Sequence, residues 1–120
     1  MNIEELREYC LSKKGASESF PFGEDTLVFK VMDKMFAYFS IAPKDGEFFV
    51  NLKCDPDRAI ELREEYEGVR KGYHTTGKMW NSVYLESDVS NGLIKELVDH
   101  SLDEVIKNLP KKKQEEYKNS

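Results

Sequence analysis

The chain has 120 residues, of which 39% are hydrophobic and 34% charged, as is typical of one small globular domain. This composition excludes collagen-like, coiled-coil and disordered chains, and the net charge of −5 argues against indiscriminate binding of polyanions. Cys10 and Cys54 show neither CxxC nor histidine spacing, so the sequence predicts no disulfide framework, no metal site and a reducing compartment.

The N-terminal segment predicts a helix over about residues 3–14. Asn2 and Glu5 have the spacing of a capping box, apolar residues then recur at helical intervals, and Gly15 provides a stop. Neither this segment nor any other has an apolar run long enough for a signal peptide or a membrane span. We therefore expect a cytoplasmic protein without a membrane partner.

Runs of β-branched and aromatic residues predict an antiparallel meander in the first half of the chain. Three such runs cover residues 26–31, 36–41 and 47–53, and turn-forming residues separate them. Pro21 confines any strand over residues 16–22 to an edge of the sheet.

The next segment predicts a helix followed by a hairpin. Asp55 and Pro56 are typical of a helix start, and the helix is expected to end at Gly68. Residues 69–74 and 80–86 predict the two strands of the hairpin.

Two further helices are expected near the C-terminus. Ser90 caps the first, and His100 would lie at its C-terminal end. Ser101 and Glu104 form a second capping box, which predicts that a new helix begins there and ends at Pro110.

The order of these elements, α-β(β)ββ-α-ββ-αα, predicts an α+β fold in which helices pack on one face of an antiparallel sheet. Residues 1–112 would form a single domain, and residues 113–120, which have no apolar face, a polar C-terminal tail.

Side-chain alternation along the strands assigns the two faces of the sheet. The face toward the helices would carry Leu27, Phe29, Val31, Ala37, Phe39, Ile41, Phe48, Val50, Leu52, Val83 and Leu85. The open face would carry Thr26, Val28, Lys30, Phe36, Tyr38, Ser40, Phe49, Asn51, Lys53, Trp80, Ser82 and Tyr84. Its aromatic residues interleaved with lysine and asparagine make the open face a candidate binding surface.

Catalytic chemistry is not indicated. His74 and His100 are the only histidines, and neither has a partner at a spacing diagnostic of nucleophilic or metal chemistry. The glycines match neither the P-loop nor the dinucleotide-binding pattern. The sequence therefore predicts a protein that is not an enzyme and has no cofactor.

The second hairpin concentrates the chemistry of nucleic-acid contacts. Residues 70–81 combine three cations, a tyrosine, a histidine, a tryptophan and two threonines, which suit phosphate binding and base stacking. The same residues also suit an ordinary hairpin edge. In that alternative, Trp80 is a packing anchor rather than a stacking platform.

Several sequence blocks, spread over nearly the whole chain, occur in an order shared with a known family. They cover residues 14–18, 20–23, 28–31, 34–37, 51–56, 62–63, 72–74, 80–83 and 109–112. Together they resemble the MmcQ/YjbR family. The resemblance implies a frataxin (CyaY)-like or secretion-chaperone-like α+β sandwich, and DNA binding by a double-wing motif.

The hairpin departs from the usual sequence of that family. Lys71 stands in place of a proline, residues 75–77 in place of Met-Asn-Lys, and Met79 in place of a histidine. The residues that remain are Gly72, Tyr73, His74, Lys78 and Trp80. The local charge is kept while side chains that could read bases are missing, so sequence-specific recognition is not implied.

The leading hypothesis is a nucleic-acid-binding module, for DNA, that uses its two β-hairpins as wings. Phosphate and stacking contacts would come from Lys30, Lys53, Arg63, Arg70, Lys71, Tyr73, His74, Lys78 and Trp80. The alternative is a protein-interaction or homodimerisation module that uses the aromatic open face. A third hypothesis is a small ligand bound in a crevice near Tyr73, His74 and Trp80.

Overall fold

The computed structural model describes residues 1–72 and 79–120 and contains a six-stranded antiparallel sheet in the order β1-β2-β3-β4-β6-β5. The strands are β1 (Ser17–Ser19), β2 (Thr26–Val31), β3 (Lys34–Ser40), β4 (Phe49–Lys53), β5 (Val69–Lys71) and β6 (Trp80–Tyr84). The helices are α1 (Ile3–Leu11), α2 (Pro56–Glu65), α3 (Asn91–Lys107) and α4 (Lys111–Lys118). This is the expected α+β class, with β1 at an edge of the sheet.

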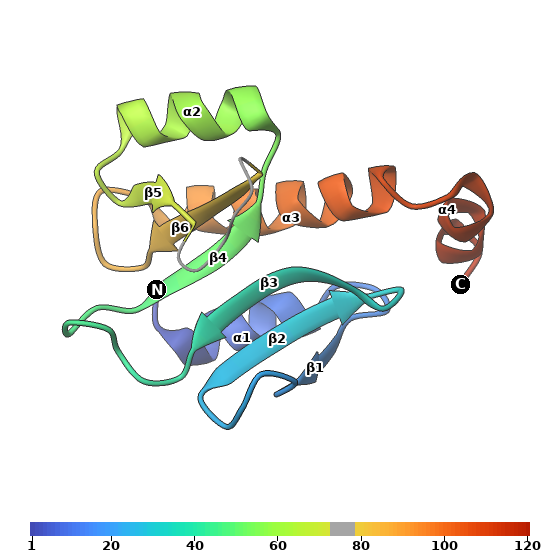
Figure 1. Cartoon of the computed structure of the whole chain (residues 1–120), viewed down its shortest axis with the longest axis horizontal. Coiled ribbons are helices and arrows are strands. Elements are labelled where there is room, and N and C mark those ends of the chain that lie inside the picture. The colour runs from blue at the N-terminus through green and yellow to red at the C-terminus, as the bar shows by residue number, and fades with distance from the viewer. Residues whose placement is uncertain (73–78) are drawn as a thin grey trace.

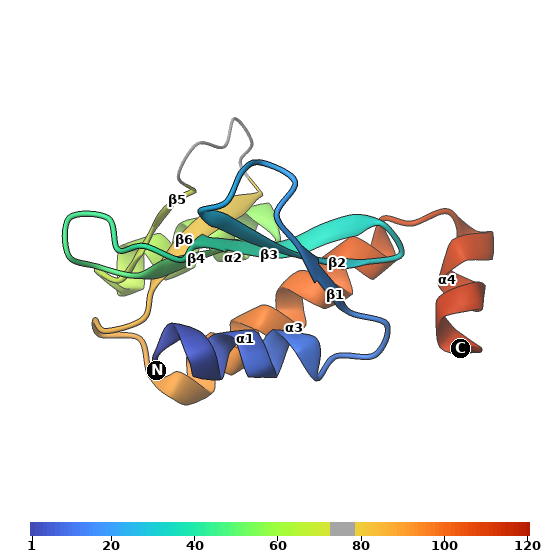
Figure 2. The same ribbon diagram turned by 90° about the horizontal axis from the view of Figure 1, so that it is seen from below.

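The helices leave one face of the sheet open. Helices α1 and α3 lie behind the sheet, and α2 covers its β5–β6 end (Figure 1). The view from below shows the sheet as one layer and α1 and α3 as a second layer (Figure 2). The core between the layers contains Leu6 of α1, Phe29 and Phe39 of the sheet, and Val98 of α3.

Helix α4 stands apart from these layers and has no buried residue. It contains most of residues 113–120, which were expected to form a polar tail. The Tyr117 hydroxyl donates a hydrogen bond of 2.9 Å to the Lys14 carbonyl, and the Lys14 ammonium lies 4.5 Å from the centre of the Tyr117 ring. These contacts hold α4 against the turn that follows α1.

Local capping decides where the first two helices begin. The Asn2 side chain accepts a hydrogen bond from the Glu5 amide, and the Glu5 carboxylate accepts one from the Asn2 amide, as the capping-box pattern predicts. Asp55 caps α2 by accepting a hydrogen bond from the Arg58 amide. Helix α1 ends at Leu11, earlier than expected, because the chain then turns with the Ala16 amide bonded to the Lys13 carbonyl.

A β-bulge corrects the assignment of two side chains to faces. The pairing of β2 with β3 shifts between Phe29 and Lys30, so that Lys30 pairs with Met35. Phe36, expected on the open face, is therefore turned into the core, where its ring centre lies 6.4 Å from that of Phe29. Ile41, expected in the core, is exposed because β3 ends one residue before it.

Helix α3 is continuous where two helices were expected. Its buried apolar side chains continue past Ser101, so the capping box predicted there does not form and the residue lies inside the helix. The buried Ser101 hydroxyl accepts a hydrogen bond of 2.9 Å from the Lys53 amide and donates one of 2.5 Å to the Phe36 carbonyl. It therefore joins α3 to β3 and β4.

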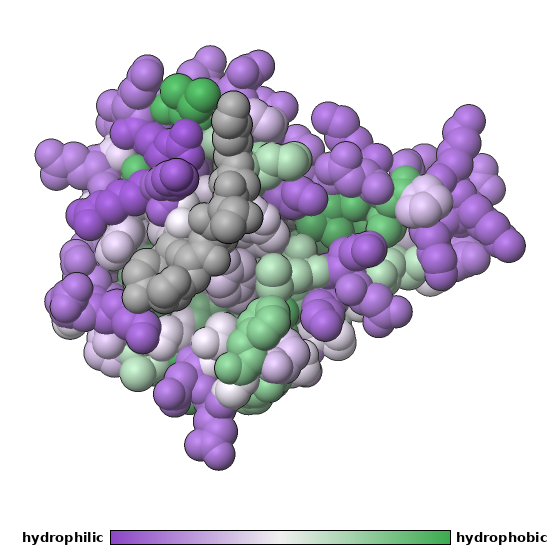
Figure 3. Space-filling model, in the orientation of Figure 1, coloured by the Kyte–Doolittle hydropathy of each residue, from purple (hydrophilic) through white to green (hydrophobic). Residues whose placement is uncertain are grey.

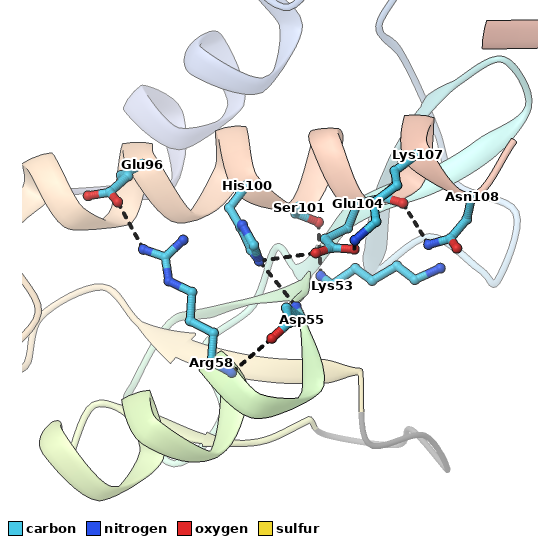
Figure 4. A network of polar contacts seen from close by, with 9 residues as sticks. All are labelled: Lys53, Asp55, Arg58, Glu96, His100, Ser101, Glu104, Lys107 and Asn108. Carbon is cyan, nitrogen blue, oxygen red and sulfur yellow. Dashed lines mark hydrogen bonds and ion pairs between the residues drawn. The ribbon is translucent and has the colours of Figure 1, made fainter.

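His100 also lies inside α3 rather than at a helix end. Its Nε2 accepts a hydrogen bond of 3.1 Å from the Asp55 amide, at the start of α2. His100 and Glu104 point from α3 toward that junction (Figure 4).

A carboxylate clamp joins the loop after α2 to the loop after β6. Asp88 accepts hydrogen bonds from the Gly68 amide at 2.8 Å and the Glu67 amide at 2.9 Å. A Cβ atom on Gly68 would lie 2.7 Å from the Cβ atom of Ser87, so this close approach requires glycine. The backbone hydrogen bonds, that of Gly68 foremost, lower the pKa of Asp88 below its usual 3.8.

Replacing Ser101 by alanine is expected to lower the free energy of unfolding by about 1–3 kcal/mol, because the Lys53 amide and the Phe36 carbonyl lose their common partner. Urea unfolding followed by circular dichroism measures the change. Ser17→Ala, at an exposed position on β1, is the control and should change little. Equal stability of S101A and the wild type would show that the bridge does not stabilise the sheet.

Replacing Asp88 by asparagine is expected to destabilise the protein in a pH-dependent way. A carboxyl group whose pKa is lowered on folding adds stability above its unfolded value of 3.8, and this stability is lost as the pH falls through the folded pKa. The difference between wild type and D88N should therefore be largest near neutral pH and shrink in acid. Urea unfolding at several pH values measures it, with Asp103→Asn as an exposed control on α3. A pH-independent difference would contradict this role of the charge.

Candidate functional site

The strand register groups the side chains of the open face. Between β4 and β6 it pairs Lys53 with Trp80, Asn51 with Ser82 and Phe49 with Tyr84. Between β2 and β3 it pairs Lys30 with Met35, Val28 with Tyr38 and Thr26 with Ser40. Arg70 of β5 pairs with Ser82 and extends the face to the edge of the sheet. Apart from Phe36, replaced by Met35, these are the residues predicted for the open face.

A buried polar chain runs through the middle of this face. The Ser82 hydroxyl donates a hydrogen bond of 2.6 Å to Oδ1 of Asn51, and the Asn51 amide nitrogen donates one of 3.5 Å to the Tyr38 carbonyl. Asn51 and Ser82 are both buried. Because buried polar groups bind in fixed directions, the chain holds the central strands in register.

Aromatic rings flank the polar chain on both sides. The ring centres of Tyr38 and Trp80 are 5.4 Å apart, and those of Phe49 and Tyr84 are 5.0 Å apart. Burial raises the pKa of the Tyr38 hydroxyl above 10, so this side chain is neutral at physiological pH. The face thus carries two pairs of rings, of which Tyr38, Trp80 and Tyr84 are half-buried and Phe49 is buried.

Three cations lie on the same face. The Arg70 guanidinium lies 4.4 Å from the centre of the Tyr84 ring. Lys30 on β2 and Lys53 on β4 are separated by one strand, so their Cα atoms are about 10 Å apart. Among residues 1–72 and 79–120, none of the three forms an ion pair with a carboxylate. Arg7 and Arg58, in contrast, are paired with Glu18 and Glu96.

Two of the predicted contact residues lie elsewhere, which corrects the expectation of one shared surface. Arg63 donates a hydrogen bond of 2.9 Å to Asn81, whose amide nitrogen in turn donates to the Ala59 carbonyl of α2. Lys71 pairs with Asn81 and therefore shares the face that α2 covers. Tyr73, His74 and Lys78 lie outside the described residues.

A hollow of about 590 Å³ opens on the open face, next to the loop between β1 and β2. Its lining consists of Phe22, Gly23, Glu24, Asp25, Thr26, Met35, Tyr38, Ser40, Lys44, Phe49 and Asn51. Figure 3 looks onto this face and shows apolar side chains among hydrophilic ones. Sequence reasoning missed the hollow because half of its walls come from loops without periodicity. The available signal was the apolar block at residues 20–23, which no strand or helix explains.

A second polar cluster connects α3 with the junction of β4 and α2 (Figure 4). Glu104 is buried, with 6% of its surface exposed. Its carboxylate oxygens lie 3.7 Å from Nε2 of His100 and 3.9 Å from Nζ of Lys107. Cys54 directly precedes Asp55 in the sequence, and burial raises the pKa of its thiol to about 11. The thiol is therefore protonated at neutral pH, and His100 already accepts the Asp55 amide proton. The cluster has a structural rather than a nucleophilic arrangement.

The described part of the chain contains neither a cluster of metal ligands nor a helix that could cross a membrane. No group of three histidine, cysteine or acidic side chains there has the geometry of a metal site. No helix in residues 1–72 and 79–120 combines the length and apolar character that crossing a membrane requires.

A comparison with protein families identifies the chain. The model of the YjbR family matches residues 11–104, which include all six strands and most of α3. The chain belongs to the YjbR family. The matched region contains every strand residue of the open face, together with α2, and stops before α4.

Individual relatives agree with this assignment. The chain is 33% identical over 113 residues to the Escherichia coli K12 protein YjbR, described as uncharacterized, with 94% of each chain covered. It is 35% identical over 95 residues to the uncharacterized protein YbdF of E. coli O157:H7, which covers 79% of this chain and 76% of that protein.

Solved structures show the same YjbR-family fold. The crystal structure of Deinococcus radiodurans DR2400, a DUF419 domain, superposes with a TM-score of 0.87 at 34% identity and covers 97% of this chain and 87% of that one. A Pseudomonas syringae protein superposes with a TM-score of 0.72 at 23% identity, covering 84% of this chain and 96% of its own, which shows the fold alone.

Both cysteines are expected to react slowly with Ellman's reagent in the folded protein. Burial raises the pKa of Cys54 to about 11 and that of Cys10 to about 12, and the thiolate is the reactive form. Absorbance measured in mildly alkaline buffer should therefore rise slowly, whereas both thiols should react at once in concentrated urea. Fast reaction of Cys54 without denaturant would contradict its description as an inert core residue.

Proposed function

We propose that this YjbR-family chain is a non-enzymatic module that binds nucleic acid on the open face of its sheet. The observation that carries the proposal is that the cations Lys30, Lys53 and Arg70 share this face with the rings of Tyr38, Trp80 and Tyr84. Phosphate groups bind cationic side chains and bases stack on aromatic rings, so the two kinds of side chain together suit a nucleic acid.

The nucleic acid that suits this face best is single-stranded. The rings lie on a sheet surface and are half-buried, so only a base whose flat face is free can stack on them. A duplex hides the flat faces of its bases and is read mainly by a helix or ribbon that enters a groove. Lys71 and Arg63, which the hypothesis of two hairpin wings counted among the contact residues, lie on the other side of the sheet. This distribution favours a single strand laid across the sheet.

Binding without catalysis agrees with the chemistry of the described residues. Cys54 is a buried, protonated thiol, and the Nε2 atom of His100 is occupied by a backbone amide. The open face itself offers rings, amides, hydroxyls and cations, which orient a ligand without supplying an activated nucleophile.

A protein partner is the second candidate for the same face. It is favoured by the exposure of large apolar side chains on the loops around the face, 68% for Phe22, 48% for Phe20 and 42% for Ile41. Exposed apolar patches often mark protein interfaces. A second copy of the chain would be the simplest partner.

Replacing Arg70 by glutamine is expected to weaken binding of a single-stranded oligonucleotide about three- to tenfold, because one phosphate contact is lost. Lys71→Gln is the matched control, since Lys71 is the next residue on β5 but lies on the opposite face. Fluorescence anisotropy measures both, and the wild-type affinity should fall with salt with a log–log slope of roughly −2 for three phosphates. Circular dichroism checks that both variants are folded.

Two results would contradict the nucleic-acid proposal. One is equal weakening by R70Q and K71Q, which would mean that charge acts without regard to face. The other is no salt-dependent binding at all. If light scattering then showed a dimer that Phe22→Ala dissociates, the open face would be a protein interface instead.

A further inference from the structure

The hollow beside the β1–β2 loop differs in charge from the rest of the open face. Two carboxylate residues, Glu24 and Asp25, line it together with a single lysine, Lys44. In the described part of the chain neither carboxylate forms an ion pair. A phosphate bound there would face a net negative wall, so the proposed nucleic-acid contacts do not account for the hollow.

The remaining lining is aromatic and apolar. Phe22, Tyr38 and Phe49 contribute three rings, and Met35 contributes a thioether. The face of an aromatic ring carries partial negative charge and attracts organic cations. Carboxylates and rings therefore favour the same kind of ligand, a positive charge on an apolar body.

We infer that this hollow binds a small organic cation of the quaternary-ammonium or alkylamine class. The cationic head would lie among the rings near Glu24 and Asp25, and the hydroxyl groups of Thr26 and Ser40 offer hydrogen bonds to a polar tail. The inference does not depend on nucleic-acid binding, because the carboxylates that it uses, Glu24 and Asp25, are not among the proposed phosphate or stacking contacts.

The size and construction of the hollow fit a binding site. Its volume of about 590 Å³ lies in the range of about 300–1,000 Å³ that is usual for small-molecule sites. The loop that forms its wall is held at both ends: the Gly23 amide bonds to the Phe20 carbonyl, and the Ile41 amide bonds to the Asp25 carbonyl. Gly23 has a φ of 120°, which only glycine adopts readily, so this loop shape is built into the sequence.

Phe22 offers the largest accessible ring of the wall. Its side chain lines the hollow and is 68% exposed, so most of the ring is free to contact a ligand. A cation placed beside it would cover part of the ring. Phe20, two residues away and 48% exposed, does not line the hollow and provides a natural comparison.

The test is a titration of the full chain with choline, followed by two-dimensional NMR of backbone amides. The neutral isostere 3,3-dimethylbutan-1-ol serves as the matched ligand control. Choline is expected to cause saturable shifts in residues 22–26, 38–40 and 49–51, and the isostere much smaller ones. The same shifts with the isostere, or no saturable shift with choline, would overturn the inference.

Variants separate charge from shape. The double change Glu24→Gln and Asp25→Asn is expected to weaken choline binding about five- to tenfold, and Phe22→Ala by a similar factor. Phe20→Ala and Glu96→Gln, which lie outside the hollow, should leave it unchanged. Equal effects of F20A and F22A would overturn the site. Binding of a methyl-lysine peptide by a chain that does not bind choline would also overturn the inference, because the ligand would then be a protein and not a small cation.

Discussion

A single buried hydroxyl fixes the centre of the sheet against the helices. The bulge in β3 turns Phe36 into the core, and the Ser101 hydroxyl lies between the Phe36 carbonyl and the Lys53 amide. The hydroxyl thus bridges β3 and β4 next to the Ala37–Leu52 pair. The same bulge pairs Met35 rather than Phe36 with Lys30 on the open face, so one backbone irregularity sets both the Ser101 bridge beneath the sheet and a side chain above it.

Charge is distributed unevenly over a chain whose net charge is −5. Some cations elsewhere in the chain are joined to carboxylates, as in the Arg58–Glu96 pair between α2 and α3 and the Lys13–Asp99 pair between the turn after α1 and α3. Lys30, Lys53 and Arg70 on the open face have no such partner among the described residues. The loop before β2 adds Glu24 and Asp25 at one end of the same face. The open face therefore has a basic part and an acidic part, which net charge alone does not reveal.

Much of the fold follows from local sequence signals, and the exceptions have tertiary causes. The caps at Asn2 and Asp55 and the strands β2 and β4 could be predicted because each depends on neighbouring residues. Phe36 could not, since one extra residue in a bulge reverses the side-chain faces. Ser101 could not either, because its capping pattern is identical to that of a true helix start. Only the sheet carbonyl and amide beneath α3 decide where its hydroxyl bonds.

The candidate site shows the same division between local and distant causes. Alternation predicts that Lys53 and Trp80 share a face, and their pairing confirms it. The hollow is lined by residues of the β1–β2 loop and the β3–β4 loop as well as by strand residues, a combination that no local pattern predicts. Tyr38 belongs to both parts of the face, since its ring contacts Trp80 and its side chain lines the hollow. A ligand in either part would therefore contact a ring that the other part also uses, and the hydrogen bond from the Asn51 amide to the Tyr38 carbonyl fixes the backbone from which that ring extends.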